Sequence, residues 1–553
     1  MRRPCPDLIR SLFVALLALF LVAPAVVVPA LAQDRVDLSP RDLAVVRINI
    51  IDLLANEPRL PLPIKQRRDV LRTYYEEQSG DLLWLNSARA AVMVSRLTNA
   101  TDDGLNPDDY PGQQLAGLMA AAGETDKRSL AIIELYFSAA FLEYASDLKV
   151  GRFLPNKIDP NFFLAPRTID EAAALAGVAK VADVETVLHA WEPQNAEYQA
   201  LRKALDDYHA LAVLGGWGTV PLGDTLKPGM TDPRIPALRA RLAVTDGAAA
   251  AAPGEPELYD EALVEAVKHF QARHGLDVDG VVGPASLVAM NVPIEDRIES
   301  IDFAMERWRW MPDDLGRQYI IVNIAGFELR RIADGEIKEK MAVVVGRPYS
   351  RTPVFSDAIR YLEFNPYWNV PAGLAAKEEL PKLQNNPAAV AAAGFEAVRG
   401  KDVYDVRQVD WAQVTPSRFP FQLRQKPGTN NALGRVKFMF PNAHDVYLHD
   451  TPSRSLFGRA ERAFSHGCIR LSRPLELADQ VLAAGGVDGW SDQRIDSVVA
   501  SLKNTVVNLK TPLPVHITYL TAWVEADGVH FSSDIYGHDE KLLAALDGKS
   551  LAW

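Results

Sequence analysis

Cysteine is almost absent from this chain, which has two cysteines among 553 residues, Cys5 and Cys468. Cys5 lies in a hydrophobic N-terminal segment with the features of a removable leader. Without that segment the chain has one thiol and cannot form an internal disulfide. A lone cysteine in an exported protein is unpaired, joined to another molecule or chemically reactive. A buried, inert cysteine is the plain alternative, and the neighbours of Cys468 decide between these possibilities.

An excess of positive charge is also absent. The chain has 59 basic and 71 acidic side chains, for a net charge of −12. Such an acidic chain is a poor ligand for the phosphate backbone, so we expect no nucleic-acid partner. Beyond the N-terminal segment, the sequence has no second apolar run long enough to span a bilayer.

Residues 1–32 contain three arginines, the apolar core LFVALLALFLV and small residues near their end. This pattern predicts a secretory signal peptide that is cleaved before Gln33. If it is not cleaved, the same uncharged run is long enough to anchor the protein in the inner membrane. In both cases the rest of the chain is exported, and we expect it in the periplasm.

Two helical regions follow the leader. Residues 38–229 repeat apolar positions at spacings of three and four, as in RSLAIIELYFSAAFLEYASDL, and predict a helical scaffold domain. Residues 230–292 predict a small three-helix module, with a turn at DVDGVVGPAS before its last helix. We expect His269 and His274 of this module to be helix-surface residues and not metal ligands.

The pattern becomes β-rich from Arg317, where QYIIVNIAGFELRRIADGEIKEKMAVVVG predicts strands separated by turns. Residues 317–525 form the expected catalytic domain. Within it, residues 372–430 are rich in alanine, proline and polar residues and predict a helical lid. Residues 526–553 are the expected C-terminal extension. The predicted fold class is therefore α+β and multidomain.

A nucleophilic cysteine reacts as its thiolate and needs a base or a cationic neighbour. In the stretch HDVYLHD, strand alternation places Val446 and Leu448 on the core face, and Tyr447 with His449 on the other. His449 is therefore the preferred base, and Tyr447 is a substrate-positioning neighbour. Alternation sends the Asp450 side chain away, so we expect a backbone carbonyl to orient the His449 ring.

The stretch SHGCIRL surrounds the thiol. His466 is two residues before Cys468, which predicts the same side in an extended segment. Gly467 permits tight backbone geometry, and the N–H groups of Gly467 and Cys468 are the expected oxyanion donors. Arg470 could bind a substrate carboxylate in a bidentate way or hold the loop by a carbonyl, and we favour the loop role.

The stretch HDTPSRSLFGRAERAFSHGCIRL resembles the signature of L,D-transpeptidases with a YkuD-type catalytic domain. That signature is a histidine, a gap of about fifteen residues, Ser/Thr-His-Gly-Cys and then Arg or Asn. Here fifteen residues separate His449 from Ser465, and the motif from Ser465 to Cys468 matches throughout. The resemblance implies that Cys468 is the nucleophile and His449 the base, with His466, Gly467 and Arg470 completing the site.

AVKHFQARHGLDVDGVVGPASLVAM likewise resembles a small peptidoglycan-binding module. The order of regions is similar to the large, lidded YcbB-like subfamily. The resemblance implies a β-sandwich catalytic domain that joins peptidoglycan tetrapeptide stems, donor and acceptor, by 3–3 cross-links through a thioester, with release of D-Ala. It also implies that no cofactor is needed and that carbapenems acylate the cysteine. Cell-wall synthases are further expected partners.

Alternatives remain open on the sequence. Water could resolve the same thioester, which would make the protein an L,D-carboxypeptidase or endopeptidase. A noncatalytic wall-binding scaffold would not need Cys468. A zinc site would use His444, His449, His466 and Cys468, but alternation places His444 on the core face. A Ser465/His466 hydrolase pair is disfavoured because adjacent side chains on an extended segment diverge.

Overall fold

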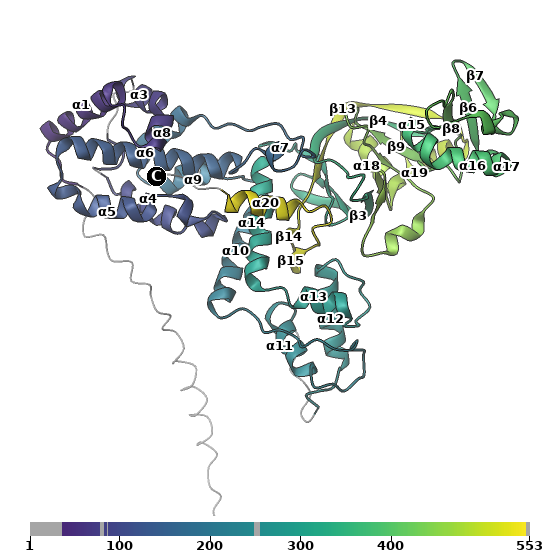
Figure 1. Ribbon diagram of the computed structural model, residues 1–553, viewed down its shortest axis with the longest axis horizontal. Coiled ribbons are helices and arrows are strands. Elements are labelled where there is room, and N and C mark those ends of the chain that lie inside the picture. Colours follow the sequence, from purple (N-terminus) through teal and green to yellow (C-terminus); the bar gives the residue numbers. More distant parts are fainter. Residues whose placement is uncertain (1–35, 78–81, 86, 248–254, 549–553) are drawn as a thin grey trace, which may run out of the picture.

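The computed structural model describes residues 36–77, 82–85, 87–247 and 255–548. The predicted signal peptide lies outside these residues. The molecule is elongated, with a helical body at one end and a sheet-rich body at the other, and a small helical module projects from the middle (Figure 1). Within the described residues, no helix combines the length and apolar character needed to cross a membrane.

The helical body forms around the long helix α6 (Lys127–Val150), whose first turn is capped by the Asp126 side chain. Most of α6 is buried, because the other helices pack around it and form a hydrophobic core of their own. This agrees with the predicted helical scaffold. The surrounding helices are α1 (Pro40–Asn56), α2 (Leu62–Gln66), α3 (Arg68–Glu77), α4 (Arg89–Thr98), α5 (Gly112–Ala121), α8 (Glu171–Lys180) and α9 (Val184–Trp191).

The projecting module consists of α11 (Ile235–Thr245), α12 (Glu261–Arg273) and α13 (Pro284–Met290), with a separate hydrophobic core. The prediction of three helices is confirmed. His269 is partly exposed and pairs with Asp246 at 3.0 Å. The surface position predicted for His274 is wrong, because its ring is buried and stacks on Phe270 at 3.7 Å between centroids.

Two helices connect the bodies. α10 (Ala196–Val213) and α14 (Ile294–Trp310) pack against each other, and both contribute buried side chains to the core of the sheet-rich body. α10 falls inside the region predicted as scaffold, yet its buried face belongs to the same core as the sheet. The short helix α7 (Pro155–Ile158) lies nearby, where the chain passes from one body to the other (Figure 1).

Within the described residues, nine strands form one curled sheet in the order β11-β3-β12-β10-β9-β4-β13-β1-β2. β2 also pairs with β3, so the sheet closes on itself and surrounds a hydrophobic core. Helices α18 (Pro474–Ala484) and α19 (Asp492–Ala500) pack against that core. The strands are β1 (Gln318–Asn323), β2 (Glu328–Ala333), β3 (Glu336–Gly346), β4 (Phe355–Phe364), β9 (Val436–Met439), β10 (Leu448–His449), β11 (Ala463–Ser465), β12 (Ile469–Leu471) and β13 (Thr505–Thr518).

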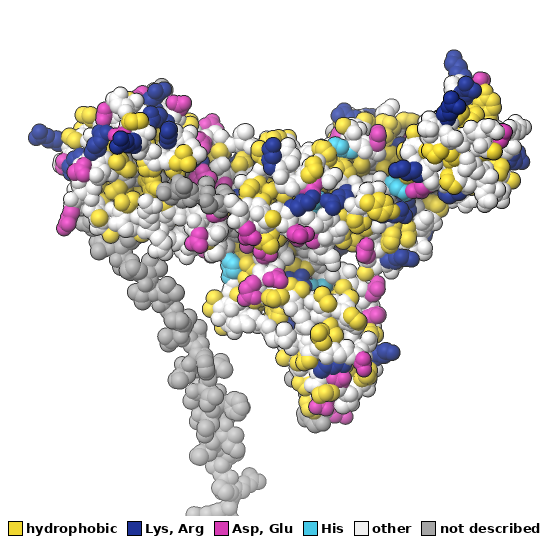
Figure 2. All heavy atoms as spheres, viewed as in Figure 1, with side chains coloured by type: hydrophobic (Ala, Val, Ile, Leu, Met, Phe, Trp, Pro, Cys, Tyr) yellow, Lys and Arg dark blue, Asp and Glu magenta, His cyan; other side chains and the backbone are white. Residues whose placement is uncertain are grey.

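The insertion predicted as a helical lid contains helices and also strands. Its helices are α15 (Ala372–Leu374), α16 (Leu380–Asn385) and α17 (Pro387–Ala392), with a π-helical turn at Ala375–Glu379. A small sheet in the order β5-β8-β6-β7 completes it and gives it a core of its own. The strands β5 (Trp368–Asn369), β6 (Phe395–Arg399), β7 (Asp402–Asp405) and β8 (Gln422–Gln425) were not predicted, because each has at most five residues. Lys and Arg side chains project from its outer end (Figure 2).

The last described elements are part of the main body. β14 (Ala522–Glu525) and β15 (Gly528–Phe531) form a hairpin, and α20 (His538–Asp547) follows. Phe531, Tyr536 and Leu542 are buried in the same core as the large sheet. The described part of residues 526–553, expected to be a C-terminal extension, therefore contributes side chains to the core of the main body.

Candidate active site

Two short parallel strands place the predicted residues side by side. In the register of β10 and β12, Leu448 is opposite Ile469 and His449 is opposite Arg470. The Ile469 N–H donates to the Tyr447 carbonyl at 3.1 Å, which brings Tyr447 beside Cys468. Leu448 and Ile469 are fully buried in the core. Because side chains alternate along a strand, Tyr447, His449, Cys468 and Arg470 share the opposite face.

The thiol of Cys468 is partly exposed and lies against polar neighbours. Its Sγ is 3.6 Å from the Asp445 carbonyl oxygen. Burial raises the pKa of Cys468, while hydrogen bonding from Tyr447 and the charges of Lys437 and Arg470 act in the opposite direction. The pKa of Tyr447 is also raised, first by burial and then by the neighbouring sulfur, so its phenol stays protonated and can donate. The site therefore holds a thiol with a hydrogen-bond donor already beside it.

His449 is held in one orientation by the backbone. Its Nδ1 is 2.5 Å from the Asp450 carbonyl oxygen, which makes Nδ1 the donor and leaves Nε2 with a free lone pair. Its ring lies 5.6 Å from the ring of Tyr447 between centroids. Burial, followed by the charge of Arg470, lowers the pKa of His449 to about 3, so the ring is a neutral base.

The Asp450 side chain points elsewhere, as strand alternation predicts. Its carboxylate accepts from Arg435 at 2.8 Å and from Arg454 at 2.6 Å. It also accepts from the Thr451 N–H. The carboxylate is thus used to fix the end of β10, and the backbone carbonyl of Asp450 orients the histidine.

Ser465 ties together the turn before the cysteine. Its hydroxyl donates to the Cys468 carbonyl at 2.5 Å and accepts from the Gly467 N–H at 3.0 Å. Thr352 Oγ1 donates to the Gly467 carbonyl at 2.7 Å. Gly467 has φ +116°, a conformation that favours glycine.

These bonds correct one sequence prediction. The Gly467 N–H is already paired with Ser465, so it is not a free oxyanion donor. The Cys468 N–H has no hydrogen-bond partner among the described residues and remains available. The structure thus leaves one of the two expected backbone donors for a developing oxyanion.

His466 faces the lid insertion. Its Nε2 is 2.8 Å from Glu378 Oε1, in the π-helical turn of the lid. The positive φ of Gly467 interrupts the extended backbone, so the spacing argument that put His466 beside Cys468 does not apply. His466 is thus a contact between the cysteine turn and the lid.

Arg470 does not hold the loop, contrary to the role favoured from the sequence. Its side chain makes no hydrogen bond with the described residues, and its buried Nε has no partner among them. Burial lowers the pKa of Arg470, and the nearby positive charge of Arg347 lowers it further. The sulfur of Cys468 acts in the opposite direction and raises it. The guanidinium thus keeps free donors next to the thiol, which suits the other role considered, binding a carboxylate.

Sequence reasoning missed several residues of the site. Lys437 is opposite His449 on β9 and opposite Glu363 on β4. Its Nζ lies 3.9 Å from the centroid of the Tyr447 ring. The alternation of RVKFMF, with Val436 and Phe438 in the core, is the signal that could have placed Lys437 on the polar face.

The zinc alternative has no support in the geometry. His444 lies between aromatic rings, 4.0 Å from Phe163 and 5.0 Å from Phe355 between centroids. Among the described residues, the group whose ligand atoms converge is Glu525, Asp527 and His530. Glu525 there is already paired with Lys340.

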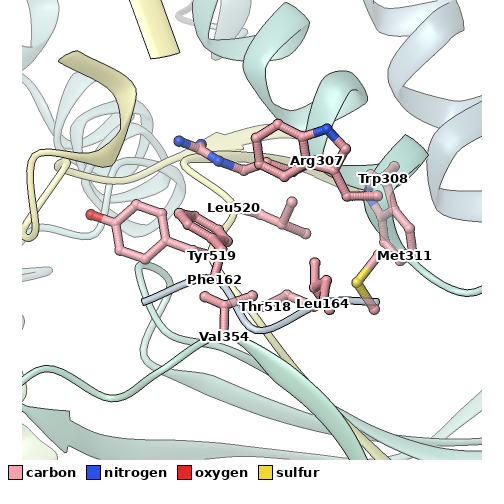
Figure 3. A pocket seen from close by; sticks show the side chains of 10 residues that line it. Phe162, Leu164, Arg307, Trp308, Met311, Val354, Thr518, Tyr519 and Leu520 are labelled. Atoms are coloured by element: carbon pink, nitrogen blue, oxygen red, sulfur yellow. The ribbon is translucent and has the colours of Figure 1, made fainter. Parts of the chain in front are cut away.

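A segment of the helical body borders the catalytic sheet. The Phe163 N–H donates to the Val354 carbonyl at 2.8 Å, and the Val354 N–H donates to the Asn161 carbonyl at 2.9 Å. Figure 3 shows Phe162 and Leu164 beside Tyr519 and Leu520 in the junction behind this segment. The remaining cavity has a volume of about 10 Å³, so the side chains of the junction pack tightly and leave no room for a ligand.

Comparisons with known proteins identify the domains. Residues 317–515 match the family model YkuD, described as "L,D-transpeptidase catalytic domain". Residues 233–290 match a "Putative peptidoglycan binding domain", and residues 69–205 match a "Scaffold domain". The chain therefore carries a YkuD-type L,D-transpeptidase catalytic domain together with a peptidoglycan-binding domain and a scaffold domain.

Individual relatives are similar over part of the chain. A "Putative L,D-transpeptidase" from Haemophilus influenzae is 34% identical over 238 residues, which are 43% of this chain and 47% of that protein. The match thus spans about half the length of this relative. The L,D-transpeptidase structure from Xylanimonas cellulosilytica is 15% identical, with 54% of this chain and 99% of that chain covered and a TM-score of 0.17. L,D-transpeptidase 3 from Mycobacterium tuberculosis, in complex with a faropenem-derived adduct, is 15% identical over 36% of this chain and 60% of its own, with a TM-score of 0.19.

Proposed function

We propose that the protein is a peptidoglycan L,D-transpeptidase that forms 3–3 cross-links between stem peptides in the periplasm. One observation carries the proposal. Cys468 lies on the same face of adjacent strands as a neutral His449, whose ring is fixed by the Asp450 carbonyl. This pair is part of a domain that matches the L,D-transpeptidase family model.

The geometry supports a two-step acyl transfer. His449 Nε2 takes the thiol proton as the Cys468 sulfur attacks the carbonyl carbon between the third and fourth residues of a tetrapeptide stem. The Cys468 N–H stabilises the oxyanion of the tetrahedral intermediate. The C–N bond then breaks, His449 returns the proton to the departing amine of D-Ala, and a thioester remains on the sulfur.

The second step resolves the thioester. The side-chain amine of an acceptor stem attacks the thioester carbonyl, and His449 takes a proton from that amine. The C–S bond breaks, the sulfur recovers its proton from His449, and a new amide joins the two stems. No metal or organic cofactor takes part in either step.

The other parts of the chain suit a polymeric substrate. The module from α11 to α13 matches a peptidoglycan-binding family model, and we assign it the role of holding the wall near the site. The lid contacts the cysteine turn through His466 and Glu378, so it is placed to control access of the acceptor. We assign the scaffold domain to partner proteins such as cell-wall synthases.

The decisive experiment incubates the full, reduced protein with purified disaccharide-tetrapeptide and follows the products by mass spectrometry. A cross-linked dimer that has lost one D-Ala supports transfer. Tripeptide as the sole product would assign the protein to the L,D-carboxypeptidases or endopeptidases. Absence of any reaction would contradict an enzymatic role and favour a wall-binding scaffold.

Two variants control this experiment. Cys468→Ser keeps the size of the side chain and removes the thiolate, so cross-linking must disappear. Cys5→Ser removes the other cysteine of the chain and must leave cross-linking unchanged. The same pair tests inhibition. We expect a carbapenem to add its mass to the Cys5→Ser protein and not to the Cys468→Ser protein.

A further inference from the structure

Lys437 occupies a central place on the polar face of the sheet without a role in the steps above. It lies on β9, between Glu363 of β4 and His449 of β10, and the three residues are directly opposite one another in the strand registers. Val436 and Phe438, its neighbours along the strand, are fully buried in the core. Lys437 therefore projects toward the side of the sheet that carries Cys468.

Within the part of the chain that the structure describes, the ammonium group of Lys437 has no carboxylate partner. Among the described residues, none forms a hydrogen bond with its Nζ or an ion pair within 4.0 Å. Instead, Nζ lies 3.9 Å from the centroid of the Tyr447 ring, well within the range of a cation–π contact. Tyr447 in turn hydrogen-bonds to Cys468. The Tyr447 side chain therefore connects the Lys437 ammonium group to the Cys468 sulfur.

Other charged or titratable groups from each neighbouring element lie near the sulfur or near the residues beside it. The loop before β10 contributes Asp445, β12 contributes Arg470, and β4 contributes Glu363. The loop after β3 contributes Arg347, beside Arg470, and the lid contributes Glu378 through His466. Three anionic positions and two cationic ones, apart from Lys437, thus lie around the thiol and its immediate neighbours.

Because His449 is neutral, it provides no positive charge to stabilise the Cys468 thiolate. A cysteine with an imidazolium partner has its thiolate stabilised by that cation. Here the ring of His449 is fully buried beside Arg470, which disfavours a second positive charge on it. The negative charge that forms on sulfur during attack needs another source of stabilisation.

We propose that Lys437 is a positioning residue that stabilises the Cys468 thiolate through the Tyr447 ring. The ammonium against the ring face draws electron density from the phenol and makes its O–H a stronger donor to sulfur. Its positive charge also lowers the energy of the thiolate across the ring, because the three side chains are partly buried and water screens their charges less than in bulk solution. This inference rests on Cys468 being the nucleophile of the proposed function.

The proposal predicts opposite effects for two neighbours. Lys437→Met keeps a long apolar side chain and removes the charge, so the Cys468 thiolate becomes less stable. Glu363→Gln removes a negative charge that opposes the thiolate through Lys437 and Tyr447, so the thiolate becomes more stable. A purely structural role for Lys437 does not predict this reversal of sign.

The experiment measures alkylation of Cys468 by iodoacetamide between pH 6 and pH 11, in a Cys5→Ser chain where it is the sole thiol. We expect Lys437→Met to raise the midpoint of the profile by about one pH unit, which lowers the rate at pH 8 about tenfold. Glu363→Gln should move the midpoint in the opposite direction, and Lys437→Arg should restore it. Lys510→Met, which removes an exposed lysine on β13, is the matched control and should change nothing.

Several results would overturn the proposal: an unchanged midpoint in folded Lys437→Met, or an unchanged or raised midpoint in Glu363→Gln. If Lys437→Met does not fold, Glu363→Gln and Lys437→Arg still decide the question. The assay does not depend on peptidoglycan. A protein that fails to cross-link stems but shows the two opposite shifts would refute the proposed function and keep this inference.

Discussion

The hydroxyl of Ser465 donates a 2.5 Å hydrogen bond to the carbonyl oxygen of Cys468, three residues further along the chain. The hydroxyl oxygen of Ser465 in turn accepts a hydrogen bond from the N–H of Gly467. One side chain thus closes the turn from both sides and fixes the backbone on which the thiol is mounted. The serine of the motif therefore serves the geometry of the cysteine and has no place in proton transfer.

Ser465→Ala tests this role of the hydroxyl. The change leaves the buried Gly467 N–H without its partner, at a cost of about 1–3 kcal/mol. Because the turn then holds the thiol less firmly, we expect kcat/KM for tetrapeptide to fall about 10- to 100-fold. Circular dichroism should report an unchanged fold. Ser465→Thr keeps the hydroxyl and is the control, and a fully active alanine variant would contradict the assignment.

The pH profile of acylation should lack an acid limb near neutrality. The folded pKa of His449 is lowered to about 3, so its ring is already a neutral base throughout the range from pH 5 to pH 9. The pKa of Cys468 is raised by burial, so its thiolate fraction increases with pH into the alkaline range. We therefore expect the acylation rate to rise steadily above pH 7, with no inflection between pH 5 and pH 7. An inflection in that interval would indicate an imidazolium–thiolate pair instead.

The contact between His466 and Glu378 should control the lid and contribute little to stability. Both side chains are partly exposed, and exposed ion pairs contribute at most about 1 kcal/mol. Glu378→Ala removes the contact, so we expect Tm to stay nearly constant while a bulky maleimide reacts with Cys468 a few times faster. The rate with small iodoacetamide is the internal control. Equal acceleration of both reagents would show a change at the thiol and not in the lid.

Tyr536 should be important for stability although it lies far from the cysteine in the sequence. Its hydroxyl donates to the Gly346 carbonyl at 2.5 Å and accepts from the Thr352 N–H at 3.2 Å. Tyr536→Phe leaves both backbone groups unpaired in a buried place, so we expect a loss of about 1–3 kcal/mol and a lower Tm. Tyr349→Phe, at a tyrosine whose side chain is exposed, is the control and should leave Tm unchanged.

The sequence predicted the parts of the site that depend on strand alternation. HDVYLHD has two apolar residues at alternate positions, and this was enough to place Tyr447 and His449 on one face and to turn Asp450 away. The same argument predicted that a backbone carbonyl would orient the histidine, which the structure has at Asp450. Regular local geometry can be inferred from a short window of residues.

Other parts depend on groups that are distant in the sequence. Thr352 bonds the Gly467 carbonyl from 115 positions away in the sequence, and the lack of a partner for the Arg470 Nε among the described residues also depends on tertiary packing, so no local pattern contains either feature. Lys437 is a single charged residue in an apolar stretch. This pattern is common in any strand that has one side facing solvent, so it does not mark Lys437 as a site residue. The lid strands were missed because an alanine-rich segment with strands of two to five residues has too few alternations to detect.

The support that Tyr536 gives to the loop from Gly346 to Thr352 has a consequence for the order in which the molecule is made. A chain grows from its N-terminus, so Cys468 is synthesised before Tyr536. Until that tyrosine arrives, Thr352 lacks one of the bonds that fix it beneath the cysteine turn. A chain that is interrupted between Cys468 and Tyr536 therefore carries the thiol without this support, and translation through Tyr536 becomes a condition for a working site.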